Sequence, residues 1–139
     1  IASCLVGSEM CIETEVTEFL YGAGELLEGW TGTRVDLVQA AHERFSGKAF
    51  CLVQRWILVE LPPEEVEPLP NGIAPMVIFA HDVIHDSRRR FAPRSWVRST
   101  YAVSFEHPCM FETRSTIYLL VGDGYRKQAK LELVLSLQP

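Results

Sequence analysis

The sequence predicts an α+β fold, with two N-terminal helices packed on one face of an antiparallel sheet of about five strands. Apolar residues recur at helical spacing up to about residue 47, and from residue 49 onward they follow the alternating period of strands. Runs rich in proline and glycine separate the strand-like segments. The 139 residues contain no internal repeat, linker or low-complexity segment, so we expect a single domain spanning residues 1–139.

The first helix is expected to begin at Ser8, whose hydroxyl suits an N-cap, and to be interrupted by Gly22 and Gly24. Residues 25–29 are expected to add at most one further helical turn. The apolar face of this helix would consist of Ile12, Val16, Phe19 and Leu20.

The second helix is expected to follow Thr33, an N-cap with Asp36 three residues later, and to end at Gly47. Its inner stripe would consist of Val35, Val38, Ala41, His42 and Phe45.

Five strands are expected after the helices. The run from residue 50 to 61 is apolar almost throughout and belongs in the centre of the sheet. Residues 62–72 hold four prolines and are expected to form an irregular loop that opens with one helical turn. The tripeptide Gly122-Asp123-Gly124 predicts a β-hairpin, because Asp-Gly readily supplies positive φ angles. The expected strands cover residues 50–61, 76–84, 96–105, 113–122 and 125–137.

The composition is typical of a globular protein, since 47% of the residues are hydrophobic and 22% are charged. No apolar run reaches the ~20 residues that a membrane-spanning helix needs, so we expect no contact with a membrane. The four cysteines form no Cys-x-x-Cys pair, which favours reduced thiols and a cytoplasmic location over a disulfide framework or a zinc site. We expect no cofactor.

The formal net charge of −5 is unevenly distributed along the chain. Residues 1–49 carry three basic and eight acidic side chains, residues 50–86 carry one and six, and residues 87–139 carry nine and four. The acidic part would be repelled by a polyanion, which argues against general DNA binding, whereas the basic part can bind an anionic group locally.

The segment "HDSRRRFAPRSWVR" at residues 85–98 is the strongest candidate for a binding site. Arginines offer planar donor forks that suit phosphate or carboxylate groups, and the aromatic residues among them can stack on a base or anchor a protein interface. The alternative is a solvated loop above buried aromatic rings, with Arg98 paired to a glutamate. The residues expected to contact a partner are Arg88, Arg89, Arg90, Phe91, Arg94, Trp96 and Arg98.

Two other segments contain residue types found in catalytic sites. In "HDVIHD", residues 81–86, a helix would bring the two histidines together for a metal, whereas a strand holds them too far apart unless it ends between them. Cys109 follows His107 by two residues, as in a thiol–histidine pair, but no third group that would orient the histidine is evident. The sequence therefore favours a protein without catalytic activity. The residues of the metal-dependent alternative are His81, Asp82, His85 and Asp86.

The N-terminal part offers an acidic surface that can imitate a phosphate backbone toward a basic partner. A solvated helix face is the alternative explanation of the same residues. They are Glu9, Glu13, Glu15, Glu18, Glu25 and Glu28.

An Asp-Ser-Arg stretch at residues 86–88, Trp-Val-Arg at 96–98 and Glu-Thr at 112–113 before a glycine-rich turn occur together within residues 81–127. This third of the chain resembles a family of small bacterial and phage-associated proteins of unknown function. The resemblance implies a bacterial or mobile-element setting, in which small acidic proteins often act as anti-defence or toxin-neutralising inhibitors. We therefore expect a non-catalytic protein that binds a protein partner. A phosphate or nucleic-acid binder and a small metal-dependent hydrolase are the alternatives.

Overall fold

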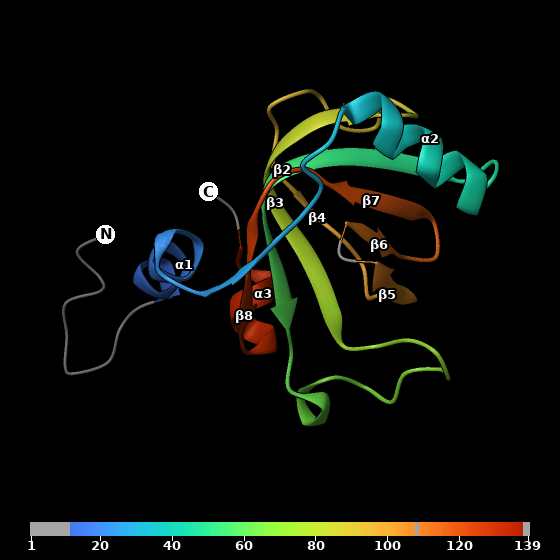
Figure 1. The fold of residues 1–139 in the computed structure, drawn as a ribbon. Coiled ribbons are helices and arrows are strands. Elements are labelled where there is room, and N and C mark those ends of the chain that lie inside the picture. Colours follow the sequence, from blue (N-terminus) through green and yellow to red (C-terminus); the bar gives the residue numbers. More distant parts are fainter. Residues whose placement is uncertain (1–11, 108, 138–139) are drawn as a thin grey trace, which may run out of the picture.

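The computed structural model describes residues 12–107 and 109–137, which form one curled, mixed sheet of eight strands with short helices on its outer side (Figure 1). Ser8 and Glu9 lie outside the described residues. In chain order, the elements are α1 (Ile12–Tyr21), β1 (Glu25–Leu27), α2 (Arg34–Arg44), β2 (Ala49–Glu60), the 3-10 helix η2 (Pro63–Glu65), β3 (Met76–Asp86), β4 (Val97–Arg98), β5 (Ser104–His107), β6 (Met110–Glu112), β7 (Thr116–Leu120), β8 (Gly124–Gln128) and α3 (Leu131–Leu135).

The expected fold class is wrong in two respects. Only α1 precedes the first strand, because residues 25–27 form β1 instead of a further helical turn. The sheet is mixed: β2 pairs antiparallel with β3 but parallel with both β7 and β8. β3 pairs with one edge of β2, so later strands can pair only with its other edge. After the antiparallel pairs β5–β6 and β6–β7, the chain enters β7 in the same direction as β2, and these two strands are therefore parallel.

The expected hairpin at residues 122–124 is also wrong, because β7 and β8 follow one another along the same side of β2. The register Ala49↔Thr116 in β7 and the register Ile57↔Tyr125 in β8 differ by one residue, so the glycine-rich segment is a bulge between them. Gly122 does have a positive φ, of 70°. The sequence thus correctly predicted a positive φ in this segment, but that φ forms a bulge between β7 and β8 instead of a hairpin turn.

Three other expected strands are divided or replaced. The expected strand 96–105 is divided into the short β4 and the beginning of β5. The expected strand 113–122 is shorter and forms β7, and β6, which was not expected, precedes it. Residues 125–137 form β8, then α3 and a final turn; Val134 in α3 and Leu137 after it are buried, whereas Leu135 is 64% exposed. Every second residue there is leucine, but burial follows the helical i, i+3 spacing.

The two best-defined predictions are confirmed. The Thr33 side chain accepts a hydrogen bond from the Asp36 backbone N–H at 3.2 Å and caps α2, and β2 lies in the centre of the sheet. The expected inner stripe of α2 is only partly correct, however. Leu37 and Ala41 are its fully buried residues, whereas Val35 is 74% exposed.

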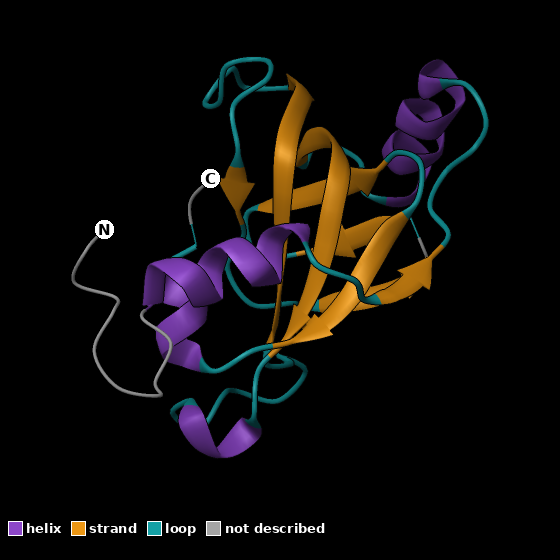
Figure 2. Cartoon of the chain, turned by 90° about the vertical axis from the view of Figure 1, so that its left-hand side faces the viewer, coloured by secondary structure: helices purple, strands orange, loops and turns teal. Residues whose placement is uncertain are grey.

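The apolar core has an inner layer and two outer layers. The inner layer fills the curl of the sheet around Trp56. Residues 102 and 103 close the curl, because Ala102 N–H donates to Met76 O of β3 at 3.0 Å and Val103 N–H donates to Glu112 O of β6 at 2.7 Å. On the outer side, α1 and α3 cover the half of β2 near Ile57, and α2 covers the half near Leu52 (Figure 2). Within the described residues, no helix is both long and apolar enough to cross a membrane.

Candidate binding face

Residues 87–96, which we call the arginine loop, connect β3 to β4 and are fixed at both ends. Ser87 N–H donates to Phe50 O at 2.8 Å, and Phe50 N–H donates to Ser87 Oγ at 2.9 Å. At the other end, Arg94 N–H donates to Val83 O and Val83 N–H donates to Ser95 O, both at 2.8 Å. The first two bonds continue the ladder between β2 and β3 into the loop, and the other two continue the ladder between β3 and β4.

An ion pair between the buried Asp86 and the partly exposed Arg90 fixes the middle of the arginine loop. The Asp86 carboxylate is fully buried and accepts bonds from Arg90 N, Nε and Nη2 at 2.6, 3.0 and 2.7 Å. Arg90 Nη1 donates to Thr116 Oγ1 at 2.8 Å. Burial acts to raise the pKa of Asp86, but the bonds from Arg90 outweigh it and hold this pKa below its usual value. Arg90 therefore positions the loop from within.

Three more of the residues expected to contact a partner have contacts inside the chain. Arg98 Nη1 donates to Val134 O at 2.7 Å, so its partner is a carbonyl of α3 instead of a glutamate. Phe91 is half-buried against the inner core and lies under the Arg90 guanidinium. Trp96 remains 39% exposed and stacks on the buried Phe79, with ring centroids 5.7 Å apart.

The remaining three arginines, Arg88, Arg89 and Arg94, are exposed. Their side chains form no hydrogen bond or ion pair with any residue that the structure describes. Arg89 and Arg94 have positive φ angles of 55° and 71°. The left-handed conformation costs an L-residue about 1–2 kcal/mol, which glycine avoids. Arginine at these two positions thus carries a conformational cost that a simple turn does not require.

The strain can be measured by comparing glycine and alanine at each position. We expect Arg89→Gly and Arg94→Gly to be more stable than the corresponding alanine variants by about 1 kcal/mol, because only glycine relieves the positive φ. At Arg88, whose φ is not positive, the order should reverse by about 0.5–1 kcal/mol. Urea unfolding of the six variants tests this, and the same order at all three positions would contradict it.

The structure divides the residues of the "HDVIHD" segment among separate contacts. Asp82 pairs with Arg55 at 2.8 Å, while Asp86 is held by Arg90. The His81 ring contacts rings of α1 and β3, and burial lowers its pKa, whereas the His85 ring lies 6.2 Å from that of Phe50. Among the described residues, no group of three His, Cys, Asp or Glu side chains is placed to hold a metal ion.

The two described cysteines, Cys51 and Cys109, are buried, and the structure joins neither of them in a disulfide. Burial raises the pKa of Cys51 to about 12 and also raises that of Cys109, so both thiols are protonated at neutral pH. The His107 side chain is not among those described. The described acidic candidates Glu13, Glu15, Glu18, Glu25 and Glu28 are all exposed.

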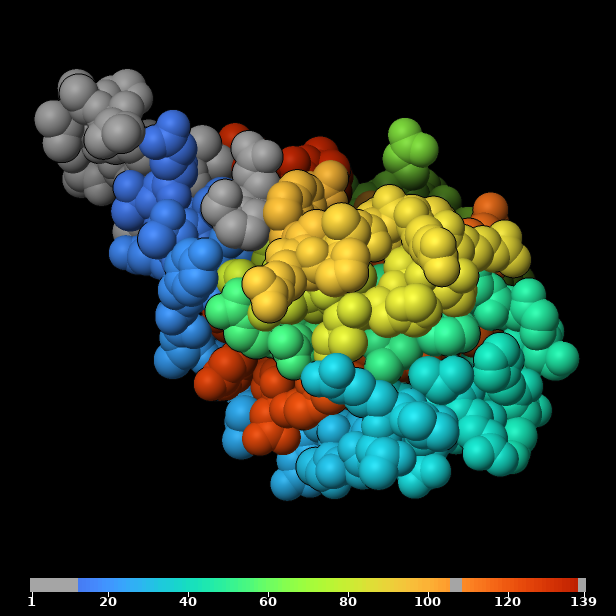
Figure 3. Space-filling view, turned by 90° about the horizontal axis from the view of Figure 1, so that it is seen from above, coloured from blue at the N-terminus to red at the C-terminus, as the bar shows by residue number. Residues whose placement is uncertain are grey.

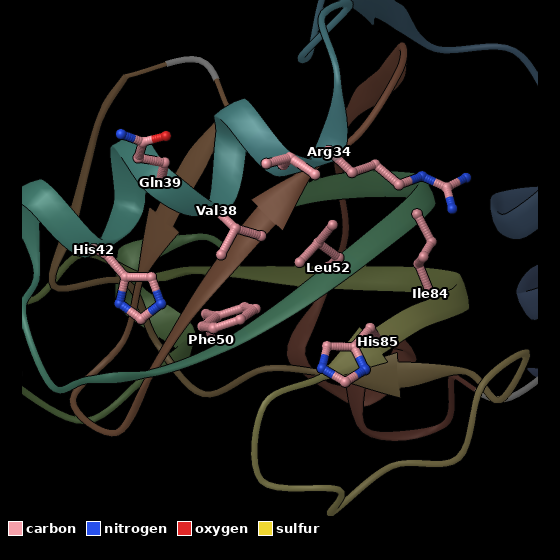
Figure 4. Close-up of a pocket in the computed structure, with 9 residues that line it drawn as sticks. Arg34, Val38, Gln39, His42, Phe50, Leu52, Ile84 and His85 are labelled. Atoms are coloured by element: carbon pink, nitrogen blue, oxygen red, sulfur yellow. The ribbon is translucent and has the colours of Figure 1, made fainter.

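An apolar groove that the sequence analysis did not predict lies beside the arginine loop and is here called the α2 groove (Figure 4). It lies between α2 and the outer face of β2 and β3, and its volume is about 700 Å³. The sequence indicated it only indirectly, because the apolar residues of α2 are more numerous than the face that packs on the sheet can bury. The lining residues are Arg34, Val35, Val38, Gln39, His42, Phe50, Leu52, Ile84 and His85.

Aromatic rings line one wall of the α2 groove. The Phe50 ring lies between His42 and His85, with ring centroids 5.6 and 6.2 Å away (Figure 4). Phe50 is also the residue bonded to Ser87, so the groove and the arginine loop share a boundary. Seen from above, the loop (yellow) and α2 (cyan) lie on opposite sides of the beginning of β2 (Figure 3).

Comparison with known proteins gives a family but no function. The family model described as "Domain of unknown function (DUF6957)" matches residues 28–136. No curated protein matches the chain. No solved structure matches it either. The matched part includes the arginine loop and the α2 groove, whereas α1 and its glutamates precede it.

Proposed function

Because the chain belongs to the DUF6957 family, whose description assigns no activity, we propose its function from the geometry of the arginine loop. It is a non-catalytic binding module that contacts a protein partner through Arg88, Arg89 and Arg94. The observation that carries this proposal is that these arginines are exposed on a loop that Arg90 and Asp86 pin in a strained conformation. Preorganised donors of this kind suit the carboxylates of a protein surface.

Several features favour a protein over a nucleic acid as the partner. The net charge is −5, and exposed glutamates of α1 would repel a polyanion. The exposed part of Trp96 and the apolar α2 groove lie next to the basic side chains, and aromatic and arginine residues together are typical of the centres of protein interfaces.

The role that we propose is inhibition by occupying the partner's surface, in the cytoplasm of a bacterium or of a phage-infected cell. The thiols of Cys51 and Cys109, which the structure does not join in a disulfide, support a reducing compartment. A role without catalysis is supported by the candidate catalytic groups themselves. Asp82 and Asp86 are paired with arginines of the same chain, and Cys109 is buried.

The test is capture of partners from the native cell with a triple variant, Arg88→Ala, Arg89→Ala and Arg94→Ala. Arg90 is left intact because its loss would release the loop itself. We expect the variant to bind the captured protein about 3 kcal/mol more weakly, which is roughly a hundredfold higher Kd. The matched control is the double variant Arg114→Ala and Lys130→Ala, which removes two exposed cations elsewhere and should bind normally.

Other results would contradict the proposal. A protein retained equally by the triple variant would move the contact to another surface. Nucleic acid in the eluate, with an affinity that falls steeply as salt rises, would replace the protein partner by a polyanion.

A further inference from the structure

We infer that the α2 groove is a second binding site, which takes an apolar segment of the partner whose neighbouring residues are acidic. The inference rests on the proposed function, because it assigns the chemistry of the partner that the arginine loop contacts. The groove was described above from its lining residues.

The first argument is that α2 has apolar residues that the described chain covers only in part. Leu37 and Ala41 pack on the sheet, and this face is sufficient to hold the helix. Val38 packs partly against the same core and also lines the groove, together with Val35, which is 74% exposed. Exposed valine at helical spacing beside a hollow is typical of a surface that buries a partner's side chains.

The second argument is the shape of the groove. Its lining extends along α2 from Arg34 to His42, a distance of about 12 Å at 1.5 Å per helical residue. That length matches two turns of a helix or about four extended residues. The groove is open to solvent along its length, whereas sites for small molecules enclose most of the ligand. A peptide segment therefore fits it better than a small molecule.

The third argument is charge complementarity. No carboxylate lines the groove, and Arg34 stands at one end of it. The carboxylates of the adjacent strand are neutralised within the chain, Asp82 by Arg55 and Asp86 by Arg90. A segment lying in the groove thus meets Arg34 and, past Phe50, the arginine loop. Acidic residues beside its apolar ones would find partners there.

The experiment uses fluorescein-labelled peptides of about twelve residues, enough for three helical turns. The first combines leucine with glutamate, the second leucine with lysine, and the third serine with glutamate. Fluorescence anisotropy gives the Kd of each peptide for the whole protein. We expect only the leucine–glutamate peptide to bind, and Val35→Asp to weaken it at least tenfold. Val35 is so exposed, and aspartate so favourable near a helix N-terminus, that this variant should fold normally.

The matched control is Leu135→Asp, which places the same charge at a comparably exposed apolar position on α3 and should leave the Kd within twofold. Equal binding by Val35→Asp, equal binding of the lysine peptide, or no binding of the glutamate peptide would overturn the inference. None of these results touches the proposed function, which fails if the triple arginine variant still captures its partner or if the captured partner is a nucleic acid.

Discussion

Replacing Asp86 by asparagine is expected to lower the free energy of unfolding by about 2 kcal/mol. The loss should be smaller than the ~3–5 kcal/mol found when one member of a fully buried ion pair is removed, because the Arg90 side chain is 33% exposed and water can solvate it. The Asp86 side chain is fully buried and accepts three bonds from Arg90. Asparagine would leave the Arg90 guanidinium without its counter-charge, in a site that also holds Thr116. The arginine loop would lose its pin, so binding of the partner should weaken as well.

Asp82→Asn is the matched control, because it removes the same charge from the same strand. Its partner Arg55 has a side chain that is 62% exposed, so this pair should contribute about 1 kcal/mol or less. Chemical unfolding of both variants at pH 7 provides the comparison. A loss below about 1 kcal/mol for Asp86→Asn would mean that the pair does not fix the loop.

The contribution of Asp86 also predicts a pH dependence. Its pKa is lower in the folded protein than the value of about 3.9 in an unfolded chain, so the stabilisation is present above that value. It is lost as pH falls through the folded pKa, because the protonated group no longer balances Arg90. The difference in stability between the native protein and Asp86→Asn should therefore shrink from pH 7 toward pH 3.

Gly124→Ala is expected to destabilise the protein by about 3 kcal/mol or more, through overpacking of the core. A Cβ added at Gly124 would lie 2.3 Å from Cδ2 of Trp56. The indole cannot withdraw easily, since it is 1% exposed and its Nε1 donates to Gly122 O at 3.1 Å. Thermal unfolding measures the loss.

The neighbouring Asp123→Ala is the control, because Asp123 is exposed and should change stability by less than about 0.5 kcal/mol. The pair of variants also distinguishes a bulge over Trp56 from the tip of a free hairpin. At a hairpin tip, alanine at residue 124 would meet no buried ring, and a small effect of Gly124→Ala would contradict the bulge.

Local signals predicted the parts of the fold that local interactions decide. The Thr33 cap, the continuous apolar run of β2 and the prolines before η2 each act within a few residues. Strand direction could not be predicted in this way, because the residue pattern of 116–128 is compatible with both parallel and antiparallel pairing to β2. Likewise, the leucines after Lys130 satisfy both strand and helix periods, and only packing on α1 and the sheet selects α3.

The candidate site was only half predictable for a similar reason. The density of arginines identified the arginine loop, but only the position of Asp86 reveals that Arg90 serves the loop internally. For α2, sequence spacing placed Val35, Val38 and His42 on an inner face. The helix packs on the sheet through Leu37, which the expected stripe did not include, and through Ala41, which it did, so Val35 and Val38 are left along the groove.

The central claim is that the partner binds across the arginine loop and the α2 groove, and hydrogen–deuterium exchange of the complex tests it most directly. The exchange of each backbone segment would be compared between the free protein and the protein saturated with its captured partner. We expect slower exchange in residues 34–42 and 84–96, and unchanged exchange in α1. Protection confined to α1 or to the edge strand β1, with residues 84–96 exchanging as in the free protein, would contradict this account.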